Sequence, residues 1–326
     1  MRLVRFSTGD GAVAVGVVEN DEIAELANPT DRVPLGQPLE LSGRRWARSQ
    51  VRLLAPIARP PKFLAIGKNY AAHTAEMGMP APDAPLFFNK QSTCVTGPTD
   101  DIWVPRDAAS VDYEGELGVV IGRSTRRVGV EEALGAVGGY LVVNDVSVRE
   151  WQRRSPTFTL GKSFDTHGPI GPWVVTPDEV PDPQDLRIRT WVNDELRQDG
   201  STSQMVLPVA EQIAYLSQSM TLEAGDVITT GTPAGVGAGF DPPRWLVPGD
   251  TVTVEIDGIG RLENRVIAAP ARWLRARVRA ARYCGSRRAR LPNPERLALA
   301  WRSRSAGQGC SRGASRRRRG TSRCPG

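Results

Sequence analysis

The chain has 326 residues, of which 40% are hydrophobic and 24% charged, a composition typical of soluble globular proteins. No apolar stretch approaches the roughly 18 residues of a membrane span, and the N-terminus lacks a signal-peptide core, so we expect a cytoplasmic protein. The net charge of +6 is unevenly distributed, because residues 268–326 hold 17 Arg and one acid (+16), which leaves −10 on residues 1–267. An acidic body with a basic tail argues against nucleic-acid binding, except through the tail.

The predicted elements, in chain order, indicate a mainly β fold. Residues 1–55 carry short alternating apolar runs and predict a small β-rich N-terminal domain. In residues 56–267, strands are predicted at 63–67, 117–122, 140–145, 173–176, 187–194, 226–231 and 251–260, and helices at 70–77, 130–137 and 209–220. We therefore predict an α+β domain in which helices flank the sheet. Residues 268–326 are either a disordered Arg-rich tail or the product of a shifted reading frame.

Glu114 and Glu116 lie in the segment Val111–Gly122, where strand alternation places both carboxylates on one face. Two neighbouring carboxylates in a partly buried strand repel each other unless a proton or a cation lies between them. Oxygen ligands suit Mg²⁺, Mn²⁺ or Ca²⁺ better than zinc. The alternative is a solvated edge strand with two exposed acids.

Asp145 ends the apolar run Tyr140–Asp145, and the end of a strand commonly delivers a functional side chain. If a helix begins here, Arg149 and Gln152 lie on the same face as Asp145. An arginine can bind a substrate carboxylate and a glutamine can donate to a developing oxyanion. The alternative is an ordinary helix with a capping Asp and an exposed Arg.

Two glycine-containing segments resemble nucleotide-binding loops but do not fit them. Gly161-Lys162-Ser163 lacks the first glycine of a phosphate-binding loop, so Lys162 is interpreted as a cation for an anionic substrate or as a solvated lysine. The glycines of residues 229–239 do not match a dinucleotide-binding fingerprint. Instead, the backbone NH groups of this loop and Thr232 could hold a substrate carboxylate.

His73 lies in a predicted short helix that Asn69 could cap, with Glu76 three residues further on. A carboxylate beside an imidazole raises its basicity and fixes its tautomer, which suits proton transfer near neutral pH. A simple contact on the helix surface is the alternative. His167 has no such neighbour in the sequence and is expected to be structural.

These segments together resemble the fumarylacetoacetate hydrolase family. Five motifs of that family occur here, and their order and spacing also match the family. They are G-x-N-Y-x-x-H-x-x-E at 67–76, D-Y-E-x-E at 112–116, N-D-V-S-x-R-x-x-Q at 144–152, G-K-S-F-D-T at 161–166 and T-G-T-P-x-G-V-G at 230–237. The resemblance covers about residues 56–267 and implies a mixed β-roll domain, usually dimeric. It also implies that Glu114, Glu116 and Asp145 bind Mg²⁺ or Mn²⁺, with His73 and Glu76 on a lid-like helix.

The resemblance further implies chemistry on a small 2-oxo or 2,4-dioxo acid that chelates the metal, with Lys162, Arg149 and Gln152 stabilising enolate charge. We expect hydrolysis of a C–C bond in an acylpyruvate-like or diketo-deoxy sugar acid, with His73 activating water. Isomerisation or decarboxylation of 2-hydroxyhepta-2,4-diene-1,7-dioate and decarboxylation of oxaloacetate are alternatives within the family. A non-catalytic protein that binds polyanions through the tail is an alternative of another class.

Overall fold

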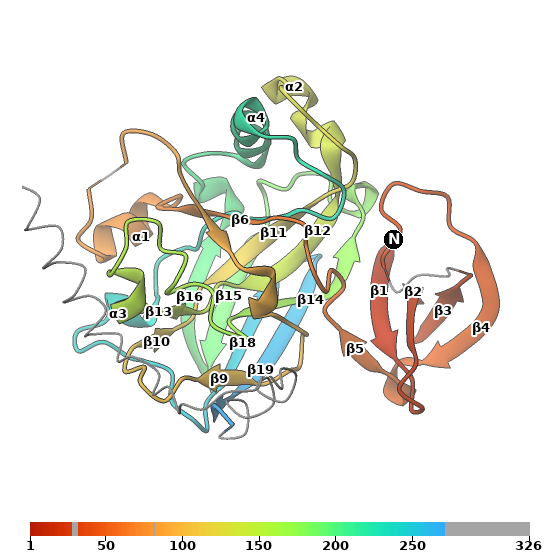
Figure 1. The fold of residues 1–326 in the computed structure, drawn as a ribbon, viewed down its shortest axis with the longest axis horizontal. Coiled ribbons are helices and arrows are strands. Elements are labelled where there is room, and N and C mark those ends of the chain that lie inside the picture. The colour runs from red at the N-terminus through yellow and green to blue at the C-terminus, as the bar shows by residue number, and fades with distance from the viewer. Residues whose placement is uncertain (28–31, 81, 271–326) are drawn as a thin grey trace, which may run out of the picture. The chain divides into compact units, whose positions relative to one another are not determined.

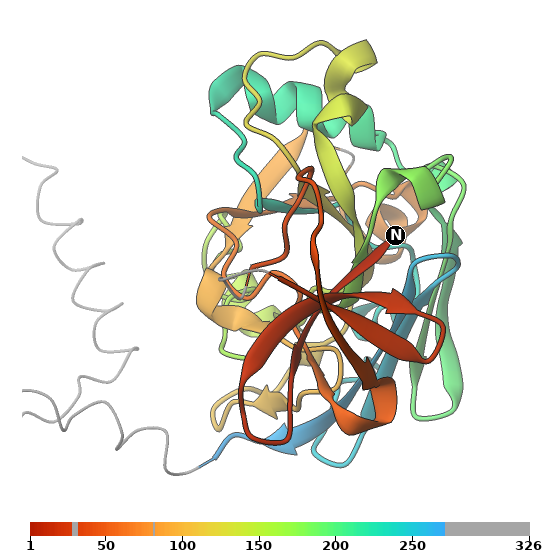
Figure 2. The same ribbon diagram turned by 90° about the vertical axis from the view of Figure 1, so that its right-hand side faces the viewer.

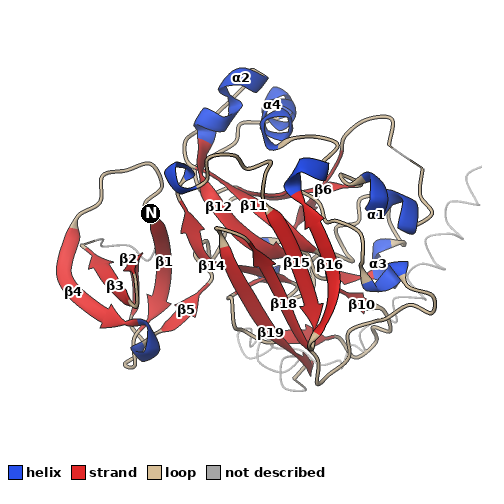
Figure 3. Ribbon diagram, turned by 180° about the vertical axis from the view of Figure 1, so that it is seen from behind, coloured by secondary structure: helices blue, strands red, loops and turns tan. Residues whose placement is uncertain are grey.

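The computed structural model describes residues 1–27, 32–80 and 82–270 (Figure 1). These residues belong to one compact unit that is built mainly from strands, with few and short helices (Figure 3), which confirms the predicted mainly β, α+β class. The prediction of a disordered tail falls, from residue 271 on, outside the described residues. In the part of the chain that the structure describes, no helix is long and apolar enough to cross a membrane.

The strands are β1 (Arg2–Ser7), β2 (Val13–Glu19), β3 (Glu22–Leu26), β4 (Leu41–Ala47), β5 (Arg52–Leu54), β6 (Phe63–Gly67), β7 (Leu86–Lys90), β8 (Val95–Thr96), β9 (Ile102–Val104), β10 (Val111–Asp112), β11 (Gly115–Ile121), β12 (Val137–Asn144), β13 (Ser147–Val148), β14 (Gly168–Val175), β15 (Arg187–Val192), β16 (Glu195–Ser201), β17 (Val227–Thr229), β18 (Thr251–Ile256) and β19 (Gly260–Ala268). The α-helices are α1 (Ala71–Glu76), α2 (Val130–Ala133), α3 (Arg149–Gln152) and α4 (Val209–Ser219).

The largest sheet runs in the order β4-β3-β2-β1-β14-β12-β11-β17-β6-β7, with β5 paired to β1 and β8 to β14. The N-terminal strands, which face the viewer in Figure 2, therefore continue the sheet of the rest of the chain through the β1–β14 pair, where Arg2 lies opposite Val175. A second sheet, β16-β15-β18-β19-β9, contacts β11, β12 and β14. Because strands β11, β12 and β14 are covered in this way, all their residues are buried.

The predicted helices and strands are present, with shifts at their ends. The helix predicted at 130–137 is α2 followed by a 3₁₀ turn (Leu134–Ala136), and α4 packs against α2 with its apolar face. The strand predicted at 251–260 is two strands, because the chain turns at Gly258, whose φ is +75°. The prediction that Asn69 caps α1 is wrong: Tyr70 holds that position, and the Asn69 side chain bonds instead to Leu207 and to the Thr230 carbonyl.

The pairing of β11 with β12 positions the candidate site. Gly115 lies opposite Asn144, so the start of β11 meets the end of β12, and the Asp145 NH donates to the Glu114 carbonyl at 2.8 Å. Glu114 and Asp145, thirty-one residues apart in the chain, are therefore neighbours across one strand pair. Because both strands are buried, a shift of register by one residue would move buried side chains to the opposite face, so burial fixes the register.

Candidate active site and metal centre

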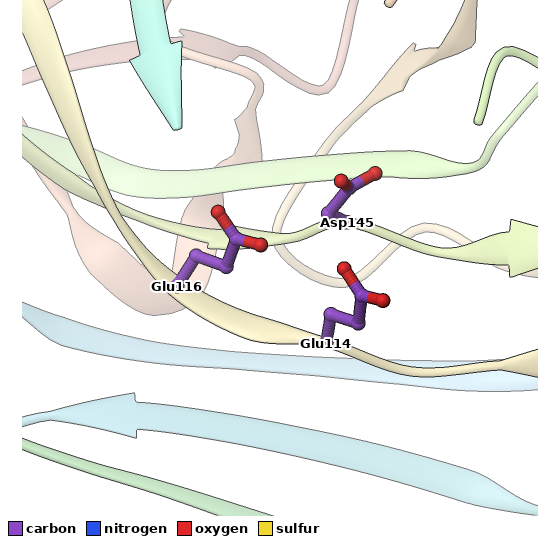
Figure 4. A group of neighbouring side chains, drawn as sticks. All are labelled: Glu114, Glu116 and Asp145. Atoms are coloured by element: carbon purple, nitrogen blue, oxygen red, sulfur yellow. The ribbon is translucent and has the colours of Figure 1, made fainter. Parts of the chain in front are cut away.

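Glu114, Glu116 and Asp145 form a buried cluster in which one carboxylate oxygen of each lies within 4.8 Å of the others. Figure 4 shows Glu114 and Glu116 along one chain segment and Asp145 on the neighbouring one. Their exposed fractions are 4%, 1% and 0%. The alternative of a solvated edge strand with exposed acids is therefore wrong, and the predicted convergence of the three carboxylates is confirmed.

The two glutamates differ in their surroundings. Burial alone would raise the pKa of Glu114, but Lys162 and Arg149 outweigh burial and lower this pKa to about 2. Burial raises the pKa of Glu116 well above its ordinary value, and the charges of Asp145 and Glu114 raise it further. Glu116 accepts hydrogen bonds from the Thr229 hydroxyl and from the Gly231 NH at 2.7 Å, neither of which brings a positive charge.

Three buried cations partly compensate the carboxylates. The Lys162 ammonium lies 2.5 Å from Glu114 Oε2 and 2.8 Å from Asp145 Oδ2, and the Lys90 ammonium lies 2.6 Å from Asp145 Oδ1. Burial alone would lower the pKa of Lys162, but Asp145 and Glu114 raise it, so the ammonium stays charged. With Arg149, three cations thus face four buried carboxylates, namely Asp112, Glu114, Glu116 and Asp145. When Glu116 is ionised, the cluster carries one uncompensated negative charge.

This donor set fits a divalent cation. The triad offers only oxygen ligands, which suit Mg²⁺ or Mn²⁺. Glu116 is the member without an ion-pair partner among the described residues, so added positive charge is favoured beside it. A divalent ion changes the net charge of the cluster from −1 to +1, and a positively charged centre attracts an anionic substrate.

Arg149 begins α3, which is only four residues long, so Asp145 precedes the helix instead of starting it. The guanidinium nevertheless reaches the cluster: Nε donates to Asp112 at 2.9 Å, and Nη1 lies 2.7 Å from Glu114 Oε1 and 3.0 Å from Gln152 Oε1. These contacts favour a role in fixing Glu114. Binding of a substrate carboxylate by Arg149 stays a prediction. Because Oε1 of Gln152 accepts from Arg149, the amide NH₂ of Gln152 is the group left to donate.

His73 and Glu76 form the predicted pair on α1, with Nδ1 of the imidazole 2.8 Å from Oε1 of the carboxylate. The other oxygen, Oε2, accepts from the Gly235 NH at 2.8 Å. His73 is 7% exposed and lines the same cavity as Glu114 and Glu116. The carboxylate thus fixes the imidazole with Nδ1 protonated and leaves Nε2 as the acceptor.

The glycine-rich loop at 229–239 has a different role from the one predicted for its backbone. Its NH groups bind carboxylates of the protein: Gly231 donates to Glu116, Gly235 to Glu76, and residues 237 and 238 to Asp112. These NH groups are therefore not free to hold a substrate carboxylate. Thr232 lines the cavity, but its hydroxyl donates to the Gly115 carbonyl at 2.9 Å, so its contact with substrate stays a prediction.

A cavity of about 100 Å³ brings most of the predicted site together. Among the residues that line it are His73, Glu114, Glu116, Arg149, Gln152, Lys162 and Thr232. His167 lies outside the lining and bonds the Trp103 carbonyl through Nε2 at 2.8 Å, in line with the structural role expected for it. The volume has room for several water molecules, and so for a small acid.

Sequence reasoning missed two buried charges, Lys90 and Asp112. Asp112 precedes Glu114 by two residues and so shares its face, a spacing that could have revealed it. Lys90 ends the apolar strand β7, where a lysine among buried residues is unusual. Its partner Asp145 lies 55 residues away in the chain, and the sequence contains no pattern that pairs them.

Comparison with known proteins shows two family matches. Residues 62–267 match the family described as fumarylacetoacetate (FAA) hydrolase, C-terminal, and residues 1–56 match the family described as Rv2993c-like, N-terminal. The oxaloacetate tautomerase YisK of Bacillus subtilis (strain 168) is 42% identical over 269 residues, which are 81% of this chain and 89% of that protein.

Solved structures show the same fold. A 2-hydroxyhepta-2,4-diene-1,7-dioate isomerase from Mycobacterium marinum matches with a TM-score of 0.70 and 38% identity, over 82% of this chain and 98% of its own. A maleylpyruvate hydrolase from Sphingobium sp. SYK-6, solved with manganese(II) and pyruvate, matches with a TM-score of 0.67 and 33% identity, over 83% of this chain and all of its own. The predicted resemblance is confirmed: the chain belongs to the fumarylacetoacetate hydrolase family.

Proposed function

We propose that the protein is a divalent-metal-dependent hydrolase that cleaves a C–C bond in a small 2,4-dioxo acid of the acylpyruvate type. The observation that carries this proposal is that two members of the buried triad, Glu114 and Glu116, line one cavity together with His73, which Glu76 holds. A cluster for an electrophilic cation and a positioned base are the two parts that such a hydrolysis needs.

The residues of the chain supply the proton transfers. With Nδ1 held by Glu76, His73 accepts a proton from water at Nε2 as the water oxygen attacks C4 of the substrate. The C3–C4 bond then breaks, its electron pair moves to C3, and the products are a carboxylic acid and the enolate of a 2-oxo acid. The imidazolium of His73 returns the proton to C3.

The cationic flank stabilises the charge that develops. The Gln152 NH₂ group donates to the enolate oxygen, and the Lys162 ammonium lies on the wall of the cavity. A divalent ion held by Glu114, Glu116 and Asp145 would supply Lewis-acid polarisation of the substrate's oxygens. Mg²⁺ and Mn²⁺ both suit the ligands, and the related maleylpyruvate hydrolase was solved with manganese. Assembly as a cytoplasmic homodimer belongs to the same proposal.

Keto–enol tautomerisation of oxaloacetate is the second candidate, because the B. subtilis tautomerase is 42% identical to this chain over 81% of its length. Tautomerisation moves a proton between C3 and an oxygen and breaks no C–C bond. His73 could move that proton without any water. The two candidates therefore use one site and differ in whether water is the nucleophile.

A metal-supplemented substrate screen tests the proposal. With Mg²⁺ or Mn²⁺ present, we expect the protein to convert an acylpyruvate into two acids, which NMR would detect as separate products. Tautomerisation alone would leave the carbon skeleton intact. Glu114→Gln should abolish turnover and metal binding, because it removes a charged ligand. Glu131→Gln, on the exposed face of α2, is the matched control and should change neither. Turnover by the Glu114 variant at the wild-type rate would refute the site.

A further inference from the structure

The cavity that Glu114 and Glu116 line also contains two basic residues that the proposed reaction does not use. Lys68 and Arg153 both line it. Lys68 follows strand β6, whereas Arg153 follows helix α3. Two segments far apart in the sequence thus bring two positive charges to one cavity.

These two charges differ from the buried cations in having no carboxylate partner. Arg149 and Lys162 are committed to Asp112, Glu114 and Asp145. In contrast, the Lys68 ammonium bonds only the Pro80 carbonyl at 3.1 Å, and the Arg153 side chain makes no hydrogen bond or ion pair with any residue that the structure describes.

The acids in the cavity wall are Glu114 and Glu116, and both are buried. They bind buried groups of the protein: Glu114 pairs with Arg149 and Lys162, and Glu116 accepts from the Gly231 NH. Lys68 is half-buried and Arg153 exposed, so both lie nearer the solvent. An anion that reached them would meet two uncompensated cations, and charge-assisted hydrogen bonds to a carboxylate are among the stronger polar contacts in proteins.

The wall beside these cations is apolar. Phe88 and Phe158 meet edge to face, with ring centroids 5.8 Å apart and planes at 70°, and Met77 and Met79 also line the cavity. The cavity therefore has buried acids, apolar side chains in its wall and two cations that are nearer the solvent than the acids. This combination of groups matches a molecule with a carboxylate at each end and a short carbon chain between them.

The backbone fixes Lys68 in place. Its φ is +61°, a conformation that is uncommon for a residue other than glycine, and the next residue, Asn69, bonds Leu207 and the Thr230 carbonyl through its side chain. Phe158, across the cavity, has a φ of +59°. Such conformations persist only where the surrounding structure holds them, and they are frequent at ligand sites.

We infer that Lys68 and Arg153 bind the distal carboxylate of the substrate, so that the enzyme selects dicarboxylic over monocarboxylic oxo acids. The inference rests on the proposed function for the reacting end of the substrate. It goes beyond that function by naming the substrate class, the dicarboxylic oxo acids. Both candidate reactions are compatible with it, because oxaloacetate also carries two carboxylates.

The test compares two substrates that differ only at the far end, 2,4-dioxoheptanedioate and 2,4-dioxoheptanoate, with Mg²⁺ present. We expect Arg153→Gln and Lys68→Gln each to raise KM for the dioate about 10-fold with little change in kcat, since a charged hydrogen bond contributes roughly one factor of ten or more in affinity. The KM for the monoacid should change by no more than about twofold in either variant. Arg154→Gln is the matched control, because Arg154 stacks on Trp151 at 4.1 Å and does not line the cavity.

Equal effects of the variants on both acids, or no effect on either, would overturn the inference. A binding measurement separates this result from failure of the proposed function. If the wild-type protein turns over neither acid, calorimetric titration of both acids with Mg²⁺ still decides: tighter binding of the dioate that Arg153→Gln abolishes supports the subsite, and equal affinities overturn it.

Discussion

Lys90 and Asp145 form an ion pair inside the protein, with Nζ of the lysine 2.6 Å from Oδ1 of the aspartate and both side chains fully buried. Lys162 binds the other oxygen of the same carboxylate at 2.8 Å. Lys90 also donates to the main-chain carbonyls of Lys162 and His167. One ammonium thus fixes both a candidate metal ligand and the chain segment that carries Lys162.

Lys90→Met should destabilise the fold strongly. It leaves one side of Asp145 and two carbonyls without their donor, and removing one partner of a buried ion pair costs about 3–5 kcal/mol. Urea unfolding at pH 7.5 measures the loss. Arg265→Gln removes an ion pair whose arginine is 76% exposed and should have little effect, because exposed pairs contribute little. Equal stabilities of the two variants would show that the Lys90 contacts are not stabilising.

Glu76→Gln should separate proton transfer from metal binding. The amide has one oxygen, so it cannot accept from both His73 Nδ1 and the Gly235 NH through separate oxygens as the carboxylate does. We expect kcat to fall about 10²-fold, a typical contribution of general acid–base catalysis, with unchanged Mg²⁺ affinity by calorimetry. Glu211→Gln, on the exposed side of α4, serves as the control. A kcat equal to wild type would exclude a role for the pair.

The sequence predicted the carboxylate triad because its members obey local rules. Glu114 and Glu116 are two residues apart in a strand, and Asp145 ends another. Lys90 and the glycine-rich loop obey no such rule. The NH groups of the loop bind Glu76, Asp112 and Glu116, which lie 115–159 residues away in the chain, so only the tertiary fold reveals what the loop holds.

Contacts between residues distant in sequence also explain why the predicted strand at 173–176 was too short. The prediction found only the second half of β14 (Gly168–Val175), because Pro169 and Pro172 disfavour a strand in sequence. In the structure the strand extends through both prolines, pairing with β8 at Pro169 and with β12 at Gly171. Contacts distant in sequence outweigh the local preference there.

Gly235→Ala should disturb the loop that positions Glu76. An added Cβ would lie 2.0 Å from the Arg197 carbonyl oxygen, and φ at this residue is +104°. Gly249→Ala is a matched control: its φ is +110°, but no atom lies within 4 Å of the added Cβ. We expect both to lose about 1–3 kcal/mol to backbone strain. Gly235→Ala should lose more free energy of unfolding than Gly249→Ala, and its kcat should also fall. Equal losses of stability on urea unfolding would show that the loop adjusts to the added methyl group.

His167 should make the stability of the protein fall in acid. Burial lowers its pKa to about 3 from an ordinary value near 6.5. Its Nε2–H donates to the Trp103 carbonyl, and Nδ1 has no partner among the described residues. Between these pKa values the unfolded chain binds a proton that the folded protein does not. Stability from this group is therefore complete above pH 6.5 and is lost as the pH falls toward 3.

The expected loss is about 1.4 kcal/mol per pH unit, or about 3 kcal/mol by pH 4.5. His167→Gln retains a donor for the Trp103 carbonyl but cannot titrate, so its stability should fall less steeply over this range. Urea unfolding of both proteins at pH 7.5, 6.5, 5.5 and 4.5 compares the slopes. The difference in free energy of unfolding at pH 7.5 gives the constant cost of the substitution, which is subtracted at each lower pH. All other titratable groups are common to both proteins, so the remaining difference reports on His167. Parallel curves would mean that His167 binds its proton equally well in the folded and unfolded states.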